Sequence, residues 1–589
     1  MKTTCNFARL AVTAGLTAAM ALGNVVAPAA MVLAAPTGST VTFSDADYAA
    51  STTYKGIQIF KATVTKTAAG TTVSNIEWAS DAVKAAVVAA IQAKDASYTS
   101  ENAQDAADWL SANAGVTGTV SMVASDNVLS AIAANLDDQG GWVTSSNASF
   151  SNLEAGYWLF LTATAGKPDG KSTDAFTSPV YAVVDGTGST TVTPKKSVPT
   201  VEKKILDDAD AADVADIKGS DKWKDIADSQ IGQEVNYRLT GTIASNYATF
   251  DTYAYKFTDV LSSGLDYVNG SVEVYALNGG TYAKIDTDHY SVANAGNTLT
   301  VEFKVGDGKK GLKDVAGVDA NTRIVVFYKA KLNANAVIGN AAGDSKGGNP
   351  NTVKLEYSNN PYAEGTGETI PDTVADFAFR LNLNKVDQGT EKGLAGAVFT
   401  IQSADANTAG QYIASKADDG EGVVAGQLVT VADANNLPEY VKFTSDSDGK
   451  IAVSGLDAGS YKVTEVQTPD DTKYTKASPF TLTISPTYDE TAMKMTGLTA
   501  AVSDADKGRT DIAFGTLDGT AGDNKLTGTN GTGTNAATGE VTINVGNTKS
   551  VGLPITGLDG VTLTWVAGGA VLVIGVAHLI RSRREESEE

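Results

Sequence analysis

One stretch of the 589-residue sequence decides the fold: Leu456-Asp-Ala-Gly-Ser-Tyr-Lys-Val-Thr-Glu465. After its Asp-Ala-Gly turn, apolar and polar side chains alternate, which is the pattern of a β-strand with one buried face. Tyr461, Val463 and Glu465 share that face, so a carboxyl group points with the apolar side chains. The stretch therefore predicts a half-buried strand that carries an acid group on its inner side.

Two further strands place polar groups on the same kind of face. Leu381-Asn-Leu-Asn-Lys385 aligns its lysine with two leucines, and Val541-Thr-Ile-Asn-Val-Gly-Asn547 aligns its last asparagine with three apolar residues. Burial lowers the pKa of an amine and raises that of a carboxyl group. A neutral Lys385 amine would then attack the Asn547 carboxamide with loss of ammonia, and Glu465 would move the protons and donate to the carboxamide oxygen.

The composition excludes most catalytic chemistry. The chain has one cysteine, Cys5, and two histidines, His289 and His578. Thiolate metal sites, cysteine nucleophiles and disulfide frameworks are thereby excluded from the main body of the chain. A net charge of −23 repels nucleic acid, and the aspartates of residues 207–216 fit no specific calcium motif. We expect no enzyme, no cofactor and no nucleic-acid partner; no residue is assigned as a metal ligand, and a metal in the Asp-rich loops stays open.

Both ends of the chain carry targeting sequences. Residues 1–35 have a basic start followed by an apolar run of small residues, which predicts a secretory signal peptide. Near the other end, an apolar run at 558–580 is long enough to span a membrane, and the arginines that follow predict a cytoplasmic tail. This run directly follows a motif that consists of Leu553, Pro554, Ile555, Thr556 and Gly557. We expect an exported protein with a membrane-bound precursor.

Between these ends the sequence predicts three domains. Residues 36–194 combine strands with helical patterns at 80–93, 101–114 and 126–136, with Ser80 and Ser100 as expected helix caps. A Pro- and Lys-containing stretch separates them from residues 195–376 and 377–550, in which short alternating runs are divided by Gly, Asn and Asp. The predicted fold class is mainly β, with tandem immunoglobulin-like β-sandwich domains and helical insertions in the first.

The last domain resembles the Cna B-type domains of Gram-positive surface proteins. The similar residues are Leu394-Ala-Gly-Ala-Val-Phe399, Asp448-Gly449, Gly459-Ser-Tyr461 and Glu465, and the last falls in the family's E-box. The sequence after the glutamate lacks the usual glycine. Such domains typically carry spontaneous Lys–Asn isopeptide bonds, so the resemblance implies a Lys385–Asn547 bond with Glu465 as proton shuttle.

The middle domain resembles the isopeptide-forming domains of pilins. The strand around Asp259 is similar to their acid-bearing strand, and residues 351–361 are similar to their closing strand. The resemblance implies a lysine–asparagine bond with Asp259 as proton shuttle. Lys203 is preferred to Lys204 because it shares a face with apolar neighbours. Asn351 is preferred to Asn359 as the partner because it begins the strand, but both share the same face and the choice stays open.

The first domain repeats the fold-deciding turn in Leu153-Glu-Ala-Gly-Tyr-Trp158. Alignment on this turn places Thr162 where the last domain has Glu465. A threonine cannot move protons as a carboxyl group does, so we predict no isopeptide bond in the first domain.

The C-terminal sequence resembles the sorting signal of Gram-positive proteins that sortases process. In that family the transpeptidase cleaves between the threonine and the glycine, here Thr556 and Gly557, and transfers the threonine carbonyl to an amine. The stretch Val192-Thr-Pro-Lys195 resembles the pilin motif, whose lysine receives that carbonyl. The acceptor implied here is Lys195, with Lys196 as the alternative.

Together these features predict a secreted major pilin, the shaft subunit of a cell-wall pilus. Its implied partners are a pilin-specific sortase, a housekeeping sortase that attaches the pilus to peptidoglycan, identical subunits, minor pilins and a possible host ligand. The alternative is a monomeric wall-anchored adhesin, or a minor pilin that binds a host ligand. A sortase substrate of either kind is not an enzyme.

Overall fold

The computed structural model describes residues 38–67, 70–115, 122–168, 170–172, 175–340, 346–514, 534–535 and 538–550. The predicted signal peptide, the sorting motif at 553–557, the apolar run at 558–580 and the basic tail lie outside these residues. Within the described ranges, no helix is both long and apolar enough to cross a membrane.

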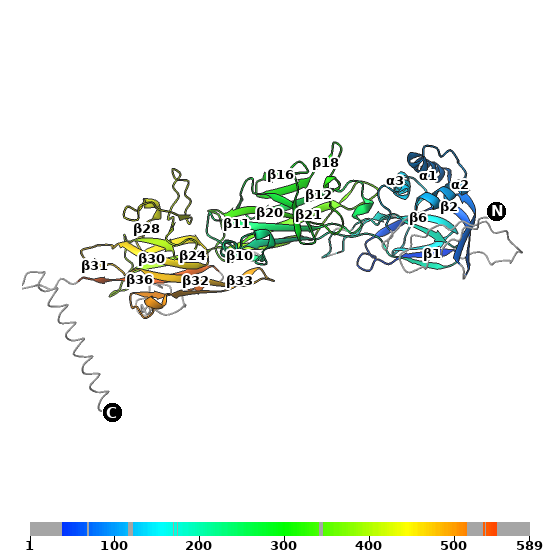
Figure 1. Ribbon diagram of the computed structural model, residues 1–589. Coiled ribbons are helices and arrows are strands. Elements are labelled where there is room, and N and C mark those ends of the chain that lie inside the picture. Colours follow the sequence, from blue (N-terminus) through cyan, green and yellow to red (C-terminus); the bar gives the residue numbers. More distant parts are fainter. Residues whose placement is uncertain are drawn as a thin grey trace, which may run out of the picture.

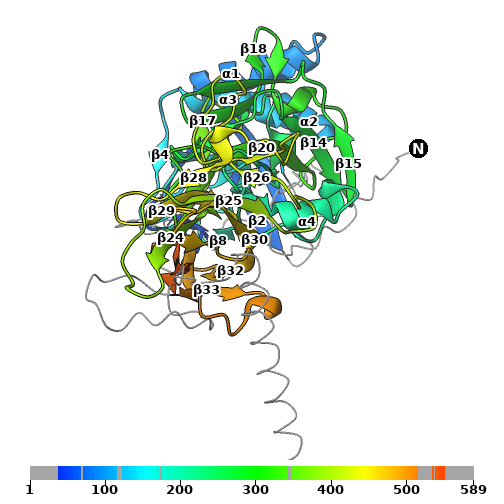
Figure 2. The ribbon, with the colours of Figure 1, turned by 90° about the vertical axis from the view of Figure 1, so that its left-hand side faces the viewer.

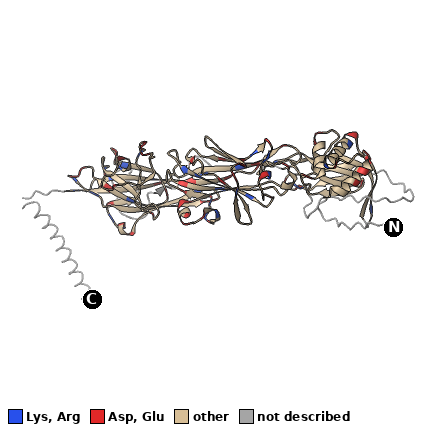
Figure 3. Ribbon diagram, turned by 45° about the horizontal axis from the view of Figure 1, so that its top comes forward, with Lys and Arg blue, Asp and Glu red and all other residues tan. Residues whose placement is uncertain are grey.

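Three groups of β-sheets follow one another in an elongated row (Figure 1). Figure 2, a view along the row from its C-terminal side, shows that the groups overlap in part and that the last group lies lower than the other two. Acidic and basic residues are scattered along the ribbon of all three groups (Figure 3). The predicted mainly β class is confirmed, with helices concentrated in the first group. The domain boundaries stay a prediction, because neighbouring groups share contacts at both junctions.

The first group packs helices on one face of a sheet and a second sheet on the other. The larger sheet has the order β3-β2-β6-β7 with β4 beside β2, and the smaller has the order β5-β1-β8. Its elements are β1 Ser39–Phe43, β2 Thr53–Thr67, β3 Gly70–Trp78, α1 Asp81–Lys94, α2 Ala103–Asn113, α3 Val128–Asp137, β4 Val143–Thr144, β5 Ser149–Leu153, β6 Gly156–Thr164, β7 Val180–Val184 and β8 Ser189–Val192.

Side-chain caps fix where the three helices begin. The Ser80 side chain accepts a hydrogen bond from the Val83 N–H at the start of α1, as expected. The expectation for Ser100 was wrong: α2 begins after Asn102, whose side chain accepts from the first turn, while the Ser100 hydroxyl donates to Asp105. Asn102 is the stronger cap because its amide oxygen reaches two backbone N–H groups.

The middle group is a two-sheet sandwich around an aromatic core. One sheet has the order β15-β14-β20-β11-β9 with β13 beside β20, and the other has the order β10-β23-β21-β12-β17-β16 with β22 beside β21. The strands are β9 Val201–Leu206, β10 Ile226–Asp228, β11 Glu234–Thr242, β12 Tyr255–Leu261, β13 Leu265–Tyr267, β14 Glu273–Asn278, β15 Thr281–Lys284, β16 Tyr290–Ala295, β17 Thr298–Phe303, β18 Val305–Gly306, β19 Lys309–Lys310, β20 Arg323–Leu332, β21 Asn349–Ser358, β22 Thr366–Glu368 and β23 Asp372–Phe377, with a short helix α4 Asp208–Ala212.

The last group is a second sandwich, in which the first and last strands are parallel neighbours. Its sheets have the orders β29-β24-β36-β31, with β34 and β35 also beside β36, and β27-β26-β25-β30-β32-β33, with β28 beside β25. The strands are β24 Phe379–Asp387, β25 Val398–Ser403, β26 Tyr412–Ile413, β27 Leu428–Val429, β28 Phe443–Thr444, β29 Lys450–Leu456, β30 Gly459–Gln467, β31 Tyr474–Thr475, β32 Phe480–Asp489, β33 Lys494–Val502, β34 Ile512–Phe514, β35 Thr534–Asn535 and β36 Glu540–Lys549.

The loop after β21 joins the middle group to the first. Its Tyr362 is buried among the core side chains of the first group. The Tyr362 hydroxyl accepts from the Thr162 N–H at 2.9 Å and donates to the Thr162 carbonyl at 3.1 Å. The Phe176 N–H donates to the Asn359 carbonyl at 2.7 Å. Tyr362 of the middle group thus provides the hydrogen-bonding partner for the backbone of Thr162, near the end of β6.

The fold-deciding turn joins the last group to the middle one. The Ile231 N–H donates to the Gly455 carbonyl at 3.0 Å, and the Gln230 side chain donates to the same oxygen at 2.7 Å. The Ala458 N–H donates to Asp228 at 3.2 Å, and Tyr488 donates to the same carboxylate at 2.8 Å. The turn between β29 and β30 therefore connects the two sheets of the last group and also forms its contact with the middle group.

We predict that Tyr362→Phe destabilises the first group by about 1–3 kcal/mol, because two buried backbone groups of Thr162 lose their partner. Urea unfolding followed by fluorescence measures this, since Trp78, Trp109, Trp142 and Trp158 all lie in that group. Tyr157→Phe is the control, because no hydrogen bond of its hydroxyl occurs within the described residues. Equal shifts in the two variants would contradict the role of the hydroxyl.

Candidate functional site

Each of the two sandwiches buries a lysine, an acid and an asparagine between its sheets. In the middle group these are Lys203, Asp259 and Asn351, and all three are 0% exposed. In the last group Lys385, Glu465 and Asn547 are 0%, 5% and 1% exposed. The structure therefore gathers the predicted site residues in two separate centres, including Asp259 and Asn351, which the resemblance to pilin domains had implied.

The centre of the last group is built on three strands. Because β24 and β36 are parallel neighbours, Lys385 lies beside Val545, two residues before Asn547. The Lys385 Nζ contacts the Asn547 Oδ1 directly. Glu465 reaches over from β30 in the opposite sheet, with its carboxylate 3.3 Å from the lysine Nζ, and accepts from Asn547 Nδ2 at 3.0 Å.

This geometry differs from the expectation in one respect. Sequence reasoning had the glutamate donate to the carboxamide oxygen, whereas Glu465 faces the carboxamide nitrogen, and the oxygen faces the lysine. The carboxylate therefore contacts both the attacking amine and the leaving group. A single acid in this place can take a proton from the first and give it to the second.

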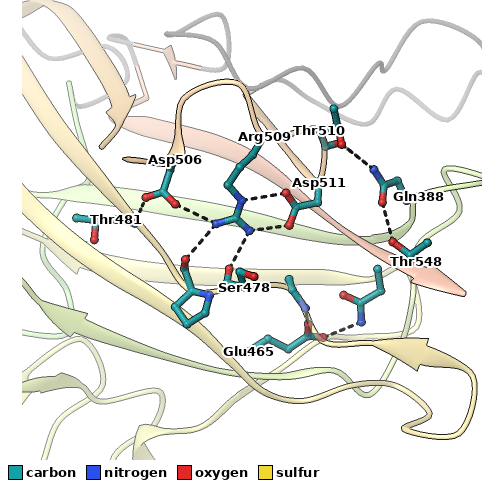
Figure 4. Close-up of polar contacts among 12 residues, drawn as sticks. Gln388, Glu465, Ser478, Thr481, Asp506, Arg509, Thr510, Asp511 and Thr548 are labelled. Carbon is teal, nitrogen blue, oxygen red and sulfur yellow. Dashed lines mark hydrogen bonds and ion pairs between the residues drawn. The ribbon is translucent and has the colours of Figure 1, made fainter. Parts of the chain in front are cut away.

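Neighbouring segments hold Glu465 in position. The Ala477 N–H donates to Glu465 Oε2 at 2.7 Å. The next two residues are held by Arg509, whose guanidinium donates to the carbonyls of Ser478 and Pro479 and also binds the carboxylates of Asp506 and Asp511 (Figure 4). Arg509 was not found from the sequence, since it lies outside the strands and 44 positions from the glutamate along the chain.

The centre of the middle group is arranged differently. Lys203 lies on β9 in one sheet, while Asp259 on β12 and Asn351 on β21 lie in the other. The lysine Nζ donates to both Asp259 oxygens at 2.6 Å. Asn351 does not reach the carboxylate: its Nδ2 donates to the Tyr328 hydroxyl at 2.7 Å, and that hydroxyl donates to Asp259 at 2.5 Å.

Tyr328 is a component of the centre that sequence reasoning missed. Its hydroxyl also accepts from Lys203 Nζ at 2.9 Å, so it contacts the lysine, the acid and the asparagine. Burial raises the pKa of this hydroxyl well above its ordinary value, and the tyrosine remains neutral. The sequence did contain a signal for an inward-facing Tyr328, because the alternation of β20 places it on one face with Ile324 and Val326.

The two alternatives to these residues lie elsewhere. Lys204 points to the other side of β9 and pairs with Asp225 at 2.6 Å near the surface. Asn359 follows the far end of β21, roughly 25 Å along the strand from Asn351, where its backbone contacts the first group.

Burial lowers the pKa of both lysines to about 8, although Asp259 and Glu465 oppose the shift. A lysine amine with a pKa near 8 is neutral in a substantial fraction of molecules at neutral pH, whereas a solvated lysine amine is almost wholly charged. Only the neutral form has the lone pair that attacks a carbonyl carbon. Each centre thus holds an activated amine: Lys385 contacts the Asn547 carboxamide directly, whereas Lys203 is connected to the Asn351 carboxamide through the Tyr328 hydroxyl.

The remaining predicted site residues lie in or near the first group. Thr162 accepts from the Thr177 N–H at 3.0 Å, and its own backbone is bound to Tyr362. The backbone of Lys195 is held by Thr177 and Ser178, at 3.0 and 2.8 Å. Residues 553–557 lie outside the described residues. Among the described residues, no cluster of three or more acidic, histidine or cysteine side chains is placed to hold a metal ion.

Two parts of the chain match known families. Residues 231–361 match the family described as Gram-positive pilin backbone subunit 2, Cna-B-like domain. This part of the middle group is therefore similar to a Gram-positive pilin backbone domain. Residues 379–498 match the SpaA family, described as a prealbumin-like fold domain. The predicted resemblance to backbone pilins with Cna B-type domains is confirmed for these ranges, and neither family is one of enzymes.

Several solved structures resemble the chain. They include the T6 backbone pilin of serotype M6 Streptococcus pyogenes (15% identity, 88% of this chain and 100% of that chain, TM-score 0.48). The full-length major pilin SpaD from Corynebacterium diphtheriae has 14% identity over 88% of this chain and 98% of its own, with a TM-score of 0.41. Full-length RrgB from Streptococcus pneumoniae has 14% identity over 88% and 99%, with a TM-score of 0.40. A search of curated proteins finds no match.

We predict that Tyr328→Phe slows formation of a Lys203–Asn351 bond by about 100-fold or more, because the proton path to the leaving nitrogen is broken. Intact mass measures this: the native chain should be lighter than its sequence by two ammonia molecules, and the freshly made variant by one. Tyr237→Phe is the matched control, since its ring stacks on Tyr328 at 5.2 Å and its buried hydroxyl has no partner within the described residues. A missing ammonia deficit in the native chain would refute both bonds.

We also predict that bond formation is faster at higher pH. The lowered pKa means that the amine loses its proton near pH 8, so the rate should rise about tenfold per pH unit below 8 and level off above it. Chain purified from denaturant without having folded can be diluted into buffers from pH 6 to pH 9 and sampled by mass. A rate that stays flat between pH 6 and pH 8 would show that deprotonation of the lysine does not limit the reaction.

Proposed function

We propose that this chain is the backbone subunit of a covalently polymerised cell-surface pilus, stabilised by two intramolecular Lys–Asn isopeptide bonds. The observation that carries the proposal is the pair of buried centres, each of which combines a lysine of lowered pKa, an acid and an asparagine. Asp259 and Asn351 lie in the range that matches the pilin backbone family, and Lys385 and Glu465 lie in the range that matches the prealbumin-like family, which supports the same function.

The bond-forming step exchanges one amide for another. The neutral Lys385 Nζ attacks Cγ of Asn547, a new C–N bond forms, and the bond from Cγ to Nδ2 breaks. Glu465 accepts the proton that the amine loses and returns it to Nδ2, which leaves as ammonia. No oxidant or cofactor is needed. A Lys203–Asn351 bond forms in the same way, with Asp259 as the acid and Tyr328 relaying the proton.

These bonds have a structural purpose in a chain without disulfides. Each links the first strand of its sandwich to one at or near its end: Lys203 on β9 to β21, which β22 and β23 follow, and Lys385 on β24 to β36, the last strand. A crosslink between distant residues lowers the conformational entropy of the unfolded chain, as a disulfide does. Unlike a disulfide, an amide is insensitive to the redox state outside the cell.

Assembly is the work of external sortases. A pilin-specific sortase cleaves between Thr556 and Gly557 and transfers the Thr556 carbonyl to the lysine amine of the next subunit. One peptide bond is broken and one amide is formed. A housekeeping sortase attaches the finished polymer to peptidoglycan. Adhesion to a host ligand fits a fibre of this kind.

The surroundings of the two candidate lysines favour Lys195 as the acceptor. The Lys196 Nζ is bound to Asp45 at 2.8 Å and lies 4.6 Å from the centre of the Tyr48 ring, with only 8% of its side chain exposed. The Lys195 amine has no such partner within the described residues, and its side chain is only partly buried. A sortase acyl-enzyme can therefore reach the Lys195 amine without breaking an ion pair.

We predict that Lys195→Ala abolishes the polymer, so that wall material runs as one band instead of a ladder on denaturing gels. Lys196→Ala, the matched control, should keep the ladder. A ladder that persists in Lys195→Ala and disappears in Lys196→Ala would reassign the acceptor. A single band in the native chain would instead support the monomeric adhesin.

A further inference from the structure

Arg509 connects the segment that supports Glu465 to the strand that carries Asn547. It lies in the loop between β33 and β34, and only 17% of its side chain is exposed. Its guanidinium donates five hydrogen bonds, to the carbonyls of Ser478 and Pro479 and to the carboxylates of Asp506 and Asp511. Because an arginine side chain has five N–H donors, all of them are used and the group is held in one orientation (Figure 4).

The first connection leads to the acid. Arg509 Nη2 and Nη1 donate to the carbonyls of residues 478–479 at 2.9 and 3.0 Å. These residues directly follow Ala477, whose N–H donates to Glu465 Oε2 at 2.7 Å. A backbone N–H bound to one carboxylate oxygen fixes where the other oxygen points, and that oxygen accepts from Asn547 Nδ2 at 3.0 Å.

The second connection leads to the carboxamide. Arg509 Nε and Nη2 bind the two oxygens of Asp511 at 2.9 and 2.6 Å, which is a bidentate pair with a fixed geometry. The Asp511 carbonyl accepts from the Gly546 N–H at 2.7 Å. Gly546 directly precedes Asn547, so one ion pair and one hydrogen bond join the arginine to the backbone that carries the carboxamide.

Gln388 adds a connection on the other side of Asn547 (Figure 4). Its Nε2 donates to the Thr510 carbonyl at 3.1 Å, and its Oε1 accepts from Thr548 Oγ1 at 3.0 Å. The Gln388 N–H donates to the Asn547 carbonyl at 3.0 Å. Residues 510–511 are therefore linked to the backbone on both sides of the reacting asparagine.

These connections matter because the acid and the carboxamide belong to different sheets. Glu465 lies on β30 and Asn547 on β36, so the distance between them is not set by a shared ladder of backbone hydrogen bonds. A misplacement of about 1 Å can cost a reaction about 100-fold in rate. A side chain that joins the supports of both groups therefore bears on the rate of bond formation.

We propose that Arg509 is a positioning residue for the Lys385–Asn547 bond, which keeps the Glu465 carboxylate and the Asn547 carboxamide at their reacting distance. Its own hydrogen bonds go to the supporting segments, and it exchanges no proton with the reacting groups. This inference rests on the proposed function and adds to it a residue on which the rate of one of the two bonds depends. In the middle group Tyr328 contacts the lysine, the acid and the asparagine directly.

Substitution of Arg509 by glutamine tests this in the full chain. Chain purified from denaturant without having folded is diluted into neutral buffer, and samples taken over time are digested, so that each crosslinked peptide is quantified by mass. Arg509→Gln should slow formation of the Lys385–Asn547 bond by about 10- to 100-fold, because the acid and the carboxamide lose their common support. The Lys203–Asn351 bond of the same molecules should form at the native rate.

Arg380→Gln is the matched control, because Arg380 makes similar contacts in the same group. Its Nε donates to Ser454 Oγ at 2.9 Å, and its Nη1 pairs with Glu540 at 3.0 Å. Arg380 and Glu540 lie on the same two strands as Lys385 and Asn547, but towards their other end. This substitution should leave the rates of both bonds unchanged.

The pH dependence separates the charge of Arg509 from its positioning. Burial lowers the pKa of Lys385 to about 8, and the carboxylates of Glu465 and Asp511 oppose the shift. In Arg509→Gln, Asp511 loses its bound cation and opposes the shift more strongly, so the rate should rise at a higher pH than in the native chain. In Arg509→Lys the charge remains and the pH midpoint should be native, but the bond should still form slowly, because an ammonium lacks the planar fork.

Hydrogen exchange of the same samples shows whether Arg509 acts on folding instead. In both variants the amides of β25 and β30 should gain protection at the native rate while the bond forms later. If protection and bond formation slow to the same extent, Arg509 acts on folding and the inference is overturned. If Arg509→Gln does not fold, Arg509→Lys decides by the same measurements.

The outcomes separate this inference from the proposed function. A native rate of the Lys385–Asn547 bond in Arg509→Gln overturns the inference and leaves the function standing. A native rate in Arg509→Lys also overturns it, since the charge alone would then suffice. Equal slowing of both bonds, or equal slowing in Arg380→Gln, overturns it as well. If the native chain forms no Lys385–Asn547 bond, the proposed function itself fails.

Discussion

Two lysine ammonium groups without access to water constrain the structure around them. Moving a charged amine out of water costs several kcal/mol, so each lysine requires partners from strands that are far apart in the chain. Lys203 is bound by Asp259 and Tyr328, and Lys385 by Glu465 and Asn547. A slip of one residue in β9 or β24 would turn the amine outward and leave the acid unpaired. The buried charges thereby fix the register of both sandwiches.

Much of the candidate site could be predicted from the sequence, because a strand's alternation is a local property. Parity alone placed Lys203, Lys385, Glu465 and Asn547 inward and Lys204 outward. Which strands lie opposite one another depends on contacts between distant parts of the chain, and the sequence predicted these contacts less well. Asn351 was chosen because it begins its strand, and nothing in the sequence indicated that β9 and β21 belong to facing sheets. Tyr328 and Arg509 were missed because their roles arise from contacts between distant segments.

The turn that identified the fold is used differently in its two copies. In the first group the Ala155 carbonyl of the turn accepts from Gln58 within the same group. In the last group the turn is a contact with the middle group, through Gln230, Ile231 and Asp228. Burial raises the pKa of Asp457 in this turn well above its ordinary value, and Asp228 and Asp208 add to the shift. The same local sequence thus serves packing in one place and docking in another.

The parallel pairing of β24 and β36 has a mechanical consequence. Arg380 lies beside Glu540 at one end of the pair and Asp387 beside Asn547 at the other, so a pull on the two chain ends loads the strands in shear rather than opening them one hydrogen bond at a time. With an amide at Lys385 and Asn547, the force would leave β24 at the lysine and enter β36 at the asparagine. Residues 386–546 would then lie outside the load path. A fibre of such subunits would stretch only through short covalent segments, while its sandwiches stayed folded under tension.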